Sequence, residues 1–293
     1  MRTYVYGICL MKDEADFLQY QLENCLNNKL DGLIISDIMS EDGSRDILEY
    51  YRKRFSAQNV DYTIIDERQF GYFQAIKFNG MAKMAYEKCA GNHKSEFRMM
   101  IQPFDADELW TCPTMALGDL LRGSPIDFWW TGMRTMICTS RDEKRGPNPT
   151  KRIRHFLAPG DPRDEISRCK VIYRYGKDVW LELGAHRTRM ANMDTIREDG
   201  GRRGPLIHHI EATARELVFR HYPARSPEQF IRKIRNNAAA MEKNQKAIKA
   251  NANRHSVKLG KLSDAELTDY FMNNHFEEDV TKVKFDPWKG VEF

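Results

Sequence analysis

Short apolar runs alternate with longer runs of helical spacing through the first third of the chain. The apolar alternation predicts strands at 4–10, 33–38, 62–66 and 98–104. Helical spacing lies between them, at 14–28, 44–57 and 73–89, with Ser44 as the predicted N-cap of the second helix. Such alternation is typical of βαβ units, so we predict an α/β fold with a mostly parallel sheet.

The pattern changes after Trp110. Strands are predicted at 128–138, 169–175, 179–183 and 217–220, between polar connections that contain Gly and Pro. The stretch 141–166 has four prolines and charges of both signs, which predicts a long flexible loop. Two later helices have clear starts, at Ser226-Pro227-Glu228 and at the capping box Ser263-Asp264-Ala265-Glu266.

Composition excludes several classes of protein. Of the 293 residues, 41% are hydrophobic, which is outside the range of disordered chains. No window has the 18 or so apolar residues of a membrane span, and the first residues lack the apolar core of a signal peptide. The six cysteines are never closer than 16 residues, which excludes C-x-x-C zinc or redox pairs. We therefore expect a reduced, cytoplasmic compartment.

The net charge is only +4, but basic residues gather near the C-terminus. Ten Lys or Arg lie between Arg225 and Lys261, against the two acids Glu228 and Glu242. A basic helix of this kind indicates an anionic partner such as nucleic acid, a membrane surface or a phosphorylated acceptor. A solvated helical face is the alternative, because no aromatic residue interleaves from Ile231 to Leu259 for base stacking.

Acidic residues follow the predicted strands. Asp105 and Asp107 come directly after the run RMMIQPF, and further acids follow the earlier strands: Asp13, Glu14, Asp37, Asp42, Asp66 and Glu67. Ligands of open α/β sheets bind at the carboxyl ends of the strands, where these acids would gather. Carboxylate oxygens suit Mg²⁺ or Mn²⁺, so Asp105 and Asp107 are candidate metal ligands. Each acid could instead cap a helix.

Two histidines and several tryptophans are further candidates. His186 and His221 each follow a predicted strand, so either could supply a nitrogen ligand to a metal or form a structural hydrogen bond. The tryptophans that could form a stacking platform for a ligand or lie in the core are Trp110, Trp129, Trp130 and Trp180.

Several blocks of this sequence together resemble the family 2-like glycosyltransferases. VYGICLMKDEADFLQYQLENCLNNKLDGLIISDIMSEDGS resembles the opening of that family, and FDADELW resembles its D-x-D block. HYPARSPEQFIRKI is similar to a segment near the C-terminus of one subgroup, and with Gly184-Ala185-His186 the resemblance spans about residues 4–235. Two departures are Asp13, where Asn is commoner, and the lack of the usual Asn-Gly in ISDIMSEDGS.

The resemblance implies a GT-A fold with a Rossmann-like mixed sheet, a UDP-sugar or similar donor, a Mn²⁺ or Mg²⁺ ion, and sugar transfer with inversion. By the same resemblance, Glu14 and Asp42 approach the base and ribose, Gln74 and Lys77 the donor, and Asp105 and Asp107 the ribose and the metal-bound diphosphate. On this basis we predict a catalytic domain at 1–222, with a nucleotide-binding half (1–110) and an acceptor half (111–222). A basic helical extension follows at 223–293.

Inversion needs a general base that deprotonates the acceptor hydroxyl. The acids late enough in the chain to lie on the acceptor side are Asp164, Glu165, Asp178 and Glu182. We favour Glu182, because it lies in the run VWLELGAH, where partial burial could raise its pKa. The acceptor stays open among a glycan, a lipid, a protein and a modified DNA base.

Two other functions remain. A nucleotidyltransferase on a similar fold is disfavoured, because MKDEAD follows the first strand in place of a glycine-rich phosphate loop. A non-catalytic nucleic-acid-binding module would use the basic C-terminal helix, and it would bind oligonucleotides in a salt-dependent way without binding a nucleotide sugar.

Overall fold

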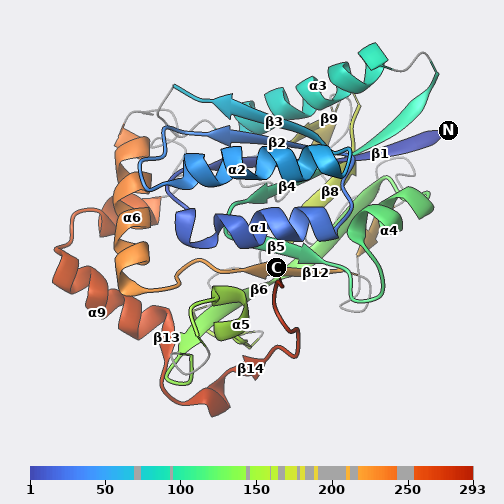
Figure 1. Cartoon of the computed structure of the whole chain (residues 1–293). Coiled ribbons are helices and arrows are strands. Elements are labelled where there is room, and N and C mark those ends of the chain that lie inside the picture. The colour runs from blue at the N-terminus through green and yellow to red at the C-terminus, as the bar shows by residue number, and fades with distance from the viewer. Residues whose placement is uncertain are drawn as a thin grey trace. The chain divides into compact units, whose positions relative to one another are not determined.

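The chain forms two compact units, each built from several stretches of the sequence (Figure 1). The computed structural model describes residues 1–68, 74–92, 95–142, 146–158, 160–163, 169–176, 179–181, 188–190, 209–211, 217–242 and 254–292. The first unit consists of 1–67, 74–133 and 168–219, and the second of 68–73, 134–167 and 220–293.

The first unit is built on a mixed sheet with the strand order β3-β2-β1-β4-β8-β6. Its strands are β1 (Arg2–Met11), β2 (Gly32–Asp37), β3 (Asp61–Asp66), β4 (Phe97–Asp105), β8 (Cys169–Arg174) and the first part of β6 (Phe128–Thr139). The neighbours among β1 to β4 pair in parallel, and β8 runs antiparallel to both β4 and β6. The carboxyl ends of four strands therefore meet at one edge.

Helices cover both faces of this sheet. They are α1 (Ala15–Asn27), α2 (Ser44–Ala57), α3 (Gln74–Asn92) and α4 (Leu117–Gly123). One apolar cluster joins α1, α2 and α4 to one face of the sheet, and a second joins α3 to the other. The short strands of this unit are β5 (Glu108–Thr111), β9 (Val179–Leu181), β10 (Thr188–Met190), β11 (His209–Glu211) and the start of β12 (Val218–His221).

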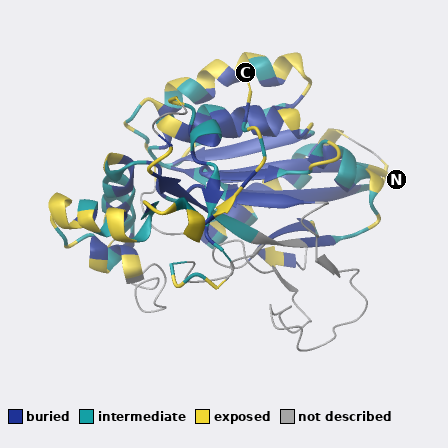
Figure 2. Ribbon diagram, turned by 90° about the horizontal axis from the view of Figure 1, so that it is seen from below, coloured by how far each residue is buried: buried dark blue, intermediate teal, exposed yellow. Residues whose placement is uncertain are grey.

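Residue alternation along β1 explains why this strand lies at the centre of the sheet. Val5 and Cys9 belong to the apolar cluster on one face, whereas Tyr6 and Ile8 belong to the cluster on the other. A strand with apolar residues on both faces must be covered on both sides. The strands β1, β2 and β4 are accordingly buried along most of their length (Figure 2).

The second unit contains the rest of β6 and β12 with short strands and helices. These are α5 (Pro149–Arg152), β7 (His155–Phe156), α6 (Pro227–Glu242), α8 (Arg254–Leu259), α9 (Asp264–Asn274), β13 (Phe276–Glu277), the 3-10 helix Val280–Lys282 and β14 (Lys284–Phe285). Phe230 of α6 stacks on Tyr270 of α9, with ring centroids 5.9 Å apart. The carboxylate of Asp286, after β14, accepts two hydrogen bonds from the guanidinium of Arg220.

The predicted α/β fold is confirmed, as a Rossmann-like mixed sheet with a C-terminal helical extension. The predicted capping box is confirmed too, because Ser263 and Glu266 exchange both capping hydrogen bonds at the start of α9. The prediction of Ser44 as an N-cap is wrong. Gly43 is the N-cap of α2, with φ at 89°, a backbone conformation that glycine adopts without strain.

The prediction of a continuous loop over 141–166 is wrong for the part that the structure describes, which contains α5 and β7. The side chain of Asn148 accepts hydrogen bonds from the backbone N–H groups of Thr150 and Lys151, and Pro149 occupies the first turn. An Asn cap followed by Pro is a helix start. Pro149 thus begins a helix, whereas the sequence analysis took the prolines of this stretch as a sign of a loop.

The described cysteines are free thiols. Cys9, Cys25, Cys89 and Cys138 are buried like small core residues, and Cys112 is partly exposed. Across the described ranges, no helix combines the length and the apolar character needed to cross a membrane.

Candidate functional site

The loops that follow β1 and β2 are joined to each other by the side chain of Asp42. One carboxylate oxygen accepts the backbone N–H of Ala15 at 2.9 Å, and the other accepts the backbone N–H and the hydroxyl of Ser44, at 3.1 and 2.6 Å. The Ser44 hydroxyl in turn accepts the backbone N–H of Glu14 at 3.0 Å. Glu14 and Asp42, which the sequence predicts to act together, therefore lie side by side at the start of α1.

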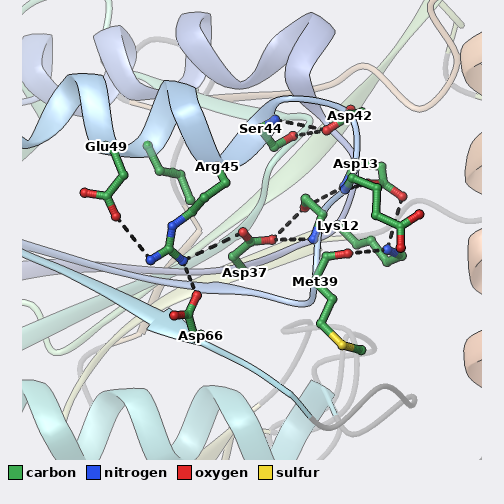
Figure 3. A network of polar contacts seen from close by, with 12 residues as sticks. Lys12, Asp13, Asp37, Met39, Asp42, Ser44, Arg45, Glu49 and Asp66 are labelled. Carbon is green, nitrogen blue, oxygen red and sulfur yellow. Dashed lines mark hydrogen bonds and ion pairs between the residues drawn. The ribbon is translucent and has the colours of Figure 1, made fainter.

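A second pair of acids lies at the ends of β2 and β3, where Asp37 and Asp66 face each other in the strand register. The guanidinium of Arg45 lies between them, with one nitrogen 3.9 Å from Asp37 and hydrogen-bonded to Asp66 (Figure 3). The same guanidinium reaches Glu49 at 3.1 Å, one turn further along α2. Arg45 thus offsets part of the negative charge at this edge of the sheet.

Asp105, the last residue of β4, is held on both carboxylate oxygens. The side-chain amide of Gln74 donates to one oxygen at 3.1 Å, and the ammonium of Lys170 donates to the other at 3.0 Å. Lys170 also lies 3.0 Å from Glu108, whose second oxygen accepts the backbone N–H of Asp105 at 2.8 Å. The carboxyl end of β4 is therefore organised as a buried ion cluster and not as an isolated pair of acids.

Electrostatics shows how crowded this cluster is. Burial raises the pKa of Glu108 to about 8, helped by the charges of Asp105 and Asp107 and opposed by Lys170. Burial alone would lower the pKa of Lys170, but the carboxylates of Asp105 and Glu108 raise it above its ordinary value, so the ammonium stays charged. Asp107 is 2% exposed. Buried carboxylates at such a place need cations close by.

The buried thiol of Cys9, near the end of β1, links the two parts of the edge. Its pKa is raised by burial and by the charges of Asp105, Glu108 and Glu14. In the register of the sheet, Cys9 is paired with Phe104, the residue before Asp105, and Glu14 lies three residues after the end of β1. The structure therefore brings Glu14, Gln74 and Asp105 to one edge of the sheet, as the sequence predicts.

Lys77 has a different environment from the one expected of a phosphate-binding lysine. Its ammonium lies 3.4 Å from Glu67, and its side chain is only 8% exposed. Burial lowers the pKa of Lys77, although Glu67 opposes this effect. The ion pair with Glu67 is its observed contact, and the predicted contact with the donor stays a prediction.

The remaining predicted site residues are the general base Glu182 and the two histidines. Glu182 and His186 lie outside the described residues, and His221 belongs to the second unit, at the end of β12. Within the described residues, no three His, Cys, Asp or Glu side chains form a group that could hold a metal ion.

Sequence reasoning missed Lys170, Glu108 and Arg45. Lys170 carried a usable signal, because it is a lysine within the apolar strand run CKVIY. A buried lysine in a strand needs a carboxylate partner, and the acids after β4 were the candidates at hand. Nothing in the sequence indicated a role for Arg45, because arginine is ordinary in the first turn of a helix.

The predicted tryptophan platforms have two outcomes. Trp110 and Trp129 are buried in the core, and the side chain of Trp130 is outside the described set. Trp180 on β9 is 55% exposed. A stacking role is therefore open to Trp180 alone of the three whose burial is described.

Several cations of the basic C-terminal region make internal contacts. Arg225 is buried and donates to the backbone oxygen of Tyr222, and Lys233 donates to the backbone oxygen of Pro223. Arg235 donates to two backbone oxygens and to Asp264. The cations at 243, 246 and 249 lie outside the described residues. The basic face is thus smaller than the sequence count suggests.

Comparison with solved structures finds similar folds at low sequence identity. A mannosyltransferase from Pyrobaculum calidifontis, in complex with GDP-Man and Mn²⁺, is 14% identical over 92% of this chain and 73% of its own, with a TM-score of 0.39. Glucosyl-3-phosphoglycerate synthase from Mycobacterium tuberculosis is 16% identical over 45% of this chain and 44% of its own, with a TM-score of 0.26. A putative glucose-1-phosphate thymidylyltransferase from Bacillus anthracis is 9% identical over 94% and 86%, with a TM-score of 0.30.

No protein-family model matches the sequence, and no curated protein matches it. Likeness at these scores identifies neither a family nor a reaction.

Proposed function

We propose that this chain is a metal-dependent glycosyltransferase, which moves a sugar from a nucleoside-diphosphate donor to an acceptor hydroxyl. A UDP-sugar is the proposed donor, and the transfer inverts the configuration of the sugar. The proposal rests on the resemblance of the sequence blocks and on one structural observation, the ion cluster around Asp105 at the carboxyl edge of the sheet.

The charge of that cluster suits a divalent cation. When all are ionised, Asp105, Asp107 and Glu108 bring three negative charges, and Lys170 brings one positive charge. The difference, 3 − 1 = 2 negative charges among these four side chains, equals the charge of one Mg²⁺ or Mn²⁺ ion. The pKa of Glu108 is raised first by burial and then by the negative charges of Asp105 and Asp107. A divalent ion would relieve that repulsion.

The carboxylates of this cluster are also chemically suited to such an ion. Asp105 and Asp107 offer hard carboxylate oxygens, which Mg²⁺ and Mn²⁺ prefer, and the diphosphate oxygens of the donor would complete the ligands. His186 and His221 are the proposed nitrogen ligands, on the sequence argument alone. A bound divalent ion would neutralise negative charge on the departing nucleoside diphosphate.

The remaining roles are binding of the donor and deprotonation of the acceptor, and we assign them to residues of the chain. We assign the base and ribose to Glu14 and Asp42, whose backbone and side-chain hydrogen bonds fix the β1–α1 and β2–α2 loops against each other. Gln74 and Lys170 hold Asp105 in one orientation, so that it meets the donor without reorganisation. Lys77 is assigned to the donor, and Glu182 to the acceptor as general base.

The test is a thermal-shift titration of the full chain with UDP in the presence and absence of Mn²⁺. Without a cation, the carboxylates repel the diphosphate, so UDP should stabilise the fold only when Mn²⁺ is present. At about 100 times its dissociation constant, the ligand should add about 2.7 kcal/mol to the free energy of unfolding. Equal stabilisation in excess EDTA would contradict the assignment of a metal.

The products separate this function from its nearest rival. A glycosyltransferase releases the nucleoside diphosphate from a nucleotide sugar, whereas a nucleotidyltransferase releases pyrophosphate from a nucleoside triphosphate and a sugar phosphate. Phosphorus NMR of the two reaction mixtures distinguishes these products directly. Salt-dependent oligonucleotide binding without any effect of UDP would favour the nucleic-acid-binding module.

A further inference from the structure

A pocket of about 680 Å³ lies in the first unit. One side is a face of α3, and the other is the segment from the end of β8 through β9. This volume falls in the range of small-molecule sites, about 300–1,000 Å³. The residue types at its walls therefore indicate the chemistry of a ligand.

The described walls are mainly apolar and aromatic. The rings of Tyr86 and Tyr175 lie 5.0 Å apart, and the buried side chains of Val179 and Leu181 contribute aliphatic surface. Trp180 lines the same pocket with more than half of its surface exposed. Such walls gain free energy by removing apolar ligand surface from water.

Three polar side chains of the walls have partners of their own. The side chain of Asn79 exchanges two hydrogen bonds of 2.8 Å with the backbone of Leu181, and its amide also donates to the backbone oxygen of Ala75. Lys83 and Glu87 form an ion pair of 3.6 Å at the exposed rim, so together they add no net charge. These three side chains therefore bring no unpaired charge to the pocket, which suits an uncharged apolar group.

Gly80 leaves the α3 wall of the pocket open. It lies in the middle of α3, where glycine is less favourable than alanine, and it lines the pocket. No atom of the described residues lies within 4 Å of the position that a Cβ would take at Gly80. Packing therefore does not require a glycine here, but a larger side chain would project into open space beside the pocket.

The pocket begins next to the proposed donor site. Gln74, the first residue of α3, donates to Asp105, and the next two residues, Ala75 and Ile76, line the pocket. Ile76 is 74% exposed, an unusual state for a large aliphatic side chain at a site entrance. From Ala75 to Glu87 the pocket follows α3 for about 18 Å, at 1.5 Å per residue. A ligand in it could thus extend toward the carboxyl edge of the sheet.

We propose that this pocket binds the apolar part of the acceptor, an alkyl or aryl group attached to the portion that carries the reacting hydroxyl. That the ligand is the acceptor rests on the proposed function. That the site binds an apolar group rests on the pocket itself. It narrows the acceptor to a molecule with a hydrophobic body and disfavours an unmodified polar glycan.

The experiment compares octyl β-glucoside with methyl β-glucoside, which share the sugar and differ in the apolar group. Isothermal titration calorimetry of the full chain should show at least tenfold tighter binding of the octyl compound, with a negative heat-capacity change. Gly80→Leu should weaken octyl binding at least tenfold, because its side chain occupies the pocket. Gly91→Leu is the matched control, since Gly91 is on the same helix, has equally open space and does not line the pocket.

Each outcome decides the proposal. Octyl binding that is absent, that equals methyl binding, or that survives Gly80→Leu unchanged would overturn it. Light scattering on the same samples shows whether Gly80→Leu instead dissociates a dimer, which would make the pocket an interface between two copies of the chain. The UDP and Mn²⁺ titration of the wild-type protein is read separately. If only that titration fails, the proposed transferase function fails and the apolar site stands.

Discussion

The ammonium of Lys170, on the antiparallel strand β8, lies 3.0 Å from the carboxylate of Asp105 at the end of the parallel strand β4. The side chain of Lys170 is 2% exposed, and that of Asp105 is 33% exposed. One partner of the pair is therefore fixed in the core while the other faces the edge where a ligand would bind. This ion pair joins β4, which carries part of the candidate site, to its antiparallel neighbour β8.

Replacing Lys170 by Met should destabilise the protein by about 3 kcal/mol, because Asp105 loses its buried cation and Glu108 loses the charge that opposes its protonation. Urea unfolding at neutral pH measures this loss. Adding Glu108→Gln to the same chain should restore part of the stability, since a buried amide needs neither a cation nor a bound proton. A loss below about 0.5 kcal/mol for Lys170→Met, which is ordinary for a surface substitution, would contradict the ion cluster.

Replacing Asp107 by Asn should abolish sugar transfer and donor hydrolysis, while the protein keeps its fold. Asn has nearly the same shape but no charge, and it relieves the repulsion that Asp107 exerts on Glu108. Because the loss of a residue that only supports a metal ligand costs about 10–100-fold, the loss of a ligand should be at least as large. Turnover and melting temperature are measured together. The exposed Asp269 of α9 provides the control Asp269→Asn, which should leave both unchanged.

His275, after α9, makes the stability of the second unit sensitive to acid. Burial lowers its pKa from 6.5 to about 4, helped by the positive charge of Lys233 and by His255. The folded state then binds fewer protons than the unfolded state, so this stability is present above pH 6.5 and is lost as the pH falls toward 4. The difference of 2.5 pKa units corresponds to about 3 kcal/mol.

The variant His275→Phe tests this effect, because a phenyl ring can keep the contacts with Phe230 and Phe271 but cannot titrate. The free energy of unfolding of the wild type should fall between pH 6.5 and 4 more steeply than that of the variant. Parallel curves for the two proteins would show that His275 does not titrate as its burial indicates.

The sequence predicted the first unit well because its local and global signals agree. The period-2 alternation of β1 and the helical spacing of α1 each match the faces that the fold buries, so the elements could be placed to within about two residues. The stretch 141–166 was misread because Pro was taken as a breaker. At Asn148-Pro149 the same residue type starts a helix, and only the hydrogen bonds of Asn148 reveal which applies.

The candidate site was predictable only in part, and for a physical reason. Acids that end parallel strands must meet at one edge, so the neighbourhood of Glu14 and Asp105 followed from chain order alone. Lys170 reaches the same edge from an antiparallel strand about 65 residues further along the chain. The position of Lys170 at this edge depends on the pairing of β8 with β4, and no local sequence pattern specifies that pairing.

Two glycines in helices of the first unit should respond to the same substitution with opposite signs. A Cβ at Gly118, in α4, would lie 2.3 Å from the backbone oxygen of Lys29 and 2.8 Å from that of Asn28. Backbone cannot move aside, and the Gly118 N–H already donates to the Asn28 oxygen at 2.8 Å. Gly118→Ala should therefore destabilise the protein by about 1–3 kcal/mol, the usual effect of overpacking.

At Gly80 the added methyl group meets open space and improves the helix propensity of α3. Gly80→Ala should therefore stabilise the protein by about 0.5–1 kcal/mol. Urea unfolding of both variants under one set of conditions gives the two signs directly. If Gly80→Ala destabilises the protein as Gly118→Ala does, the space beside Gly80 is filled in solution, and the pocket along α3 is closed to a ligand as well.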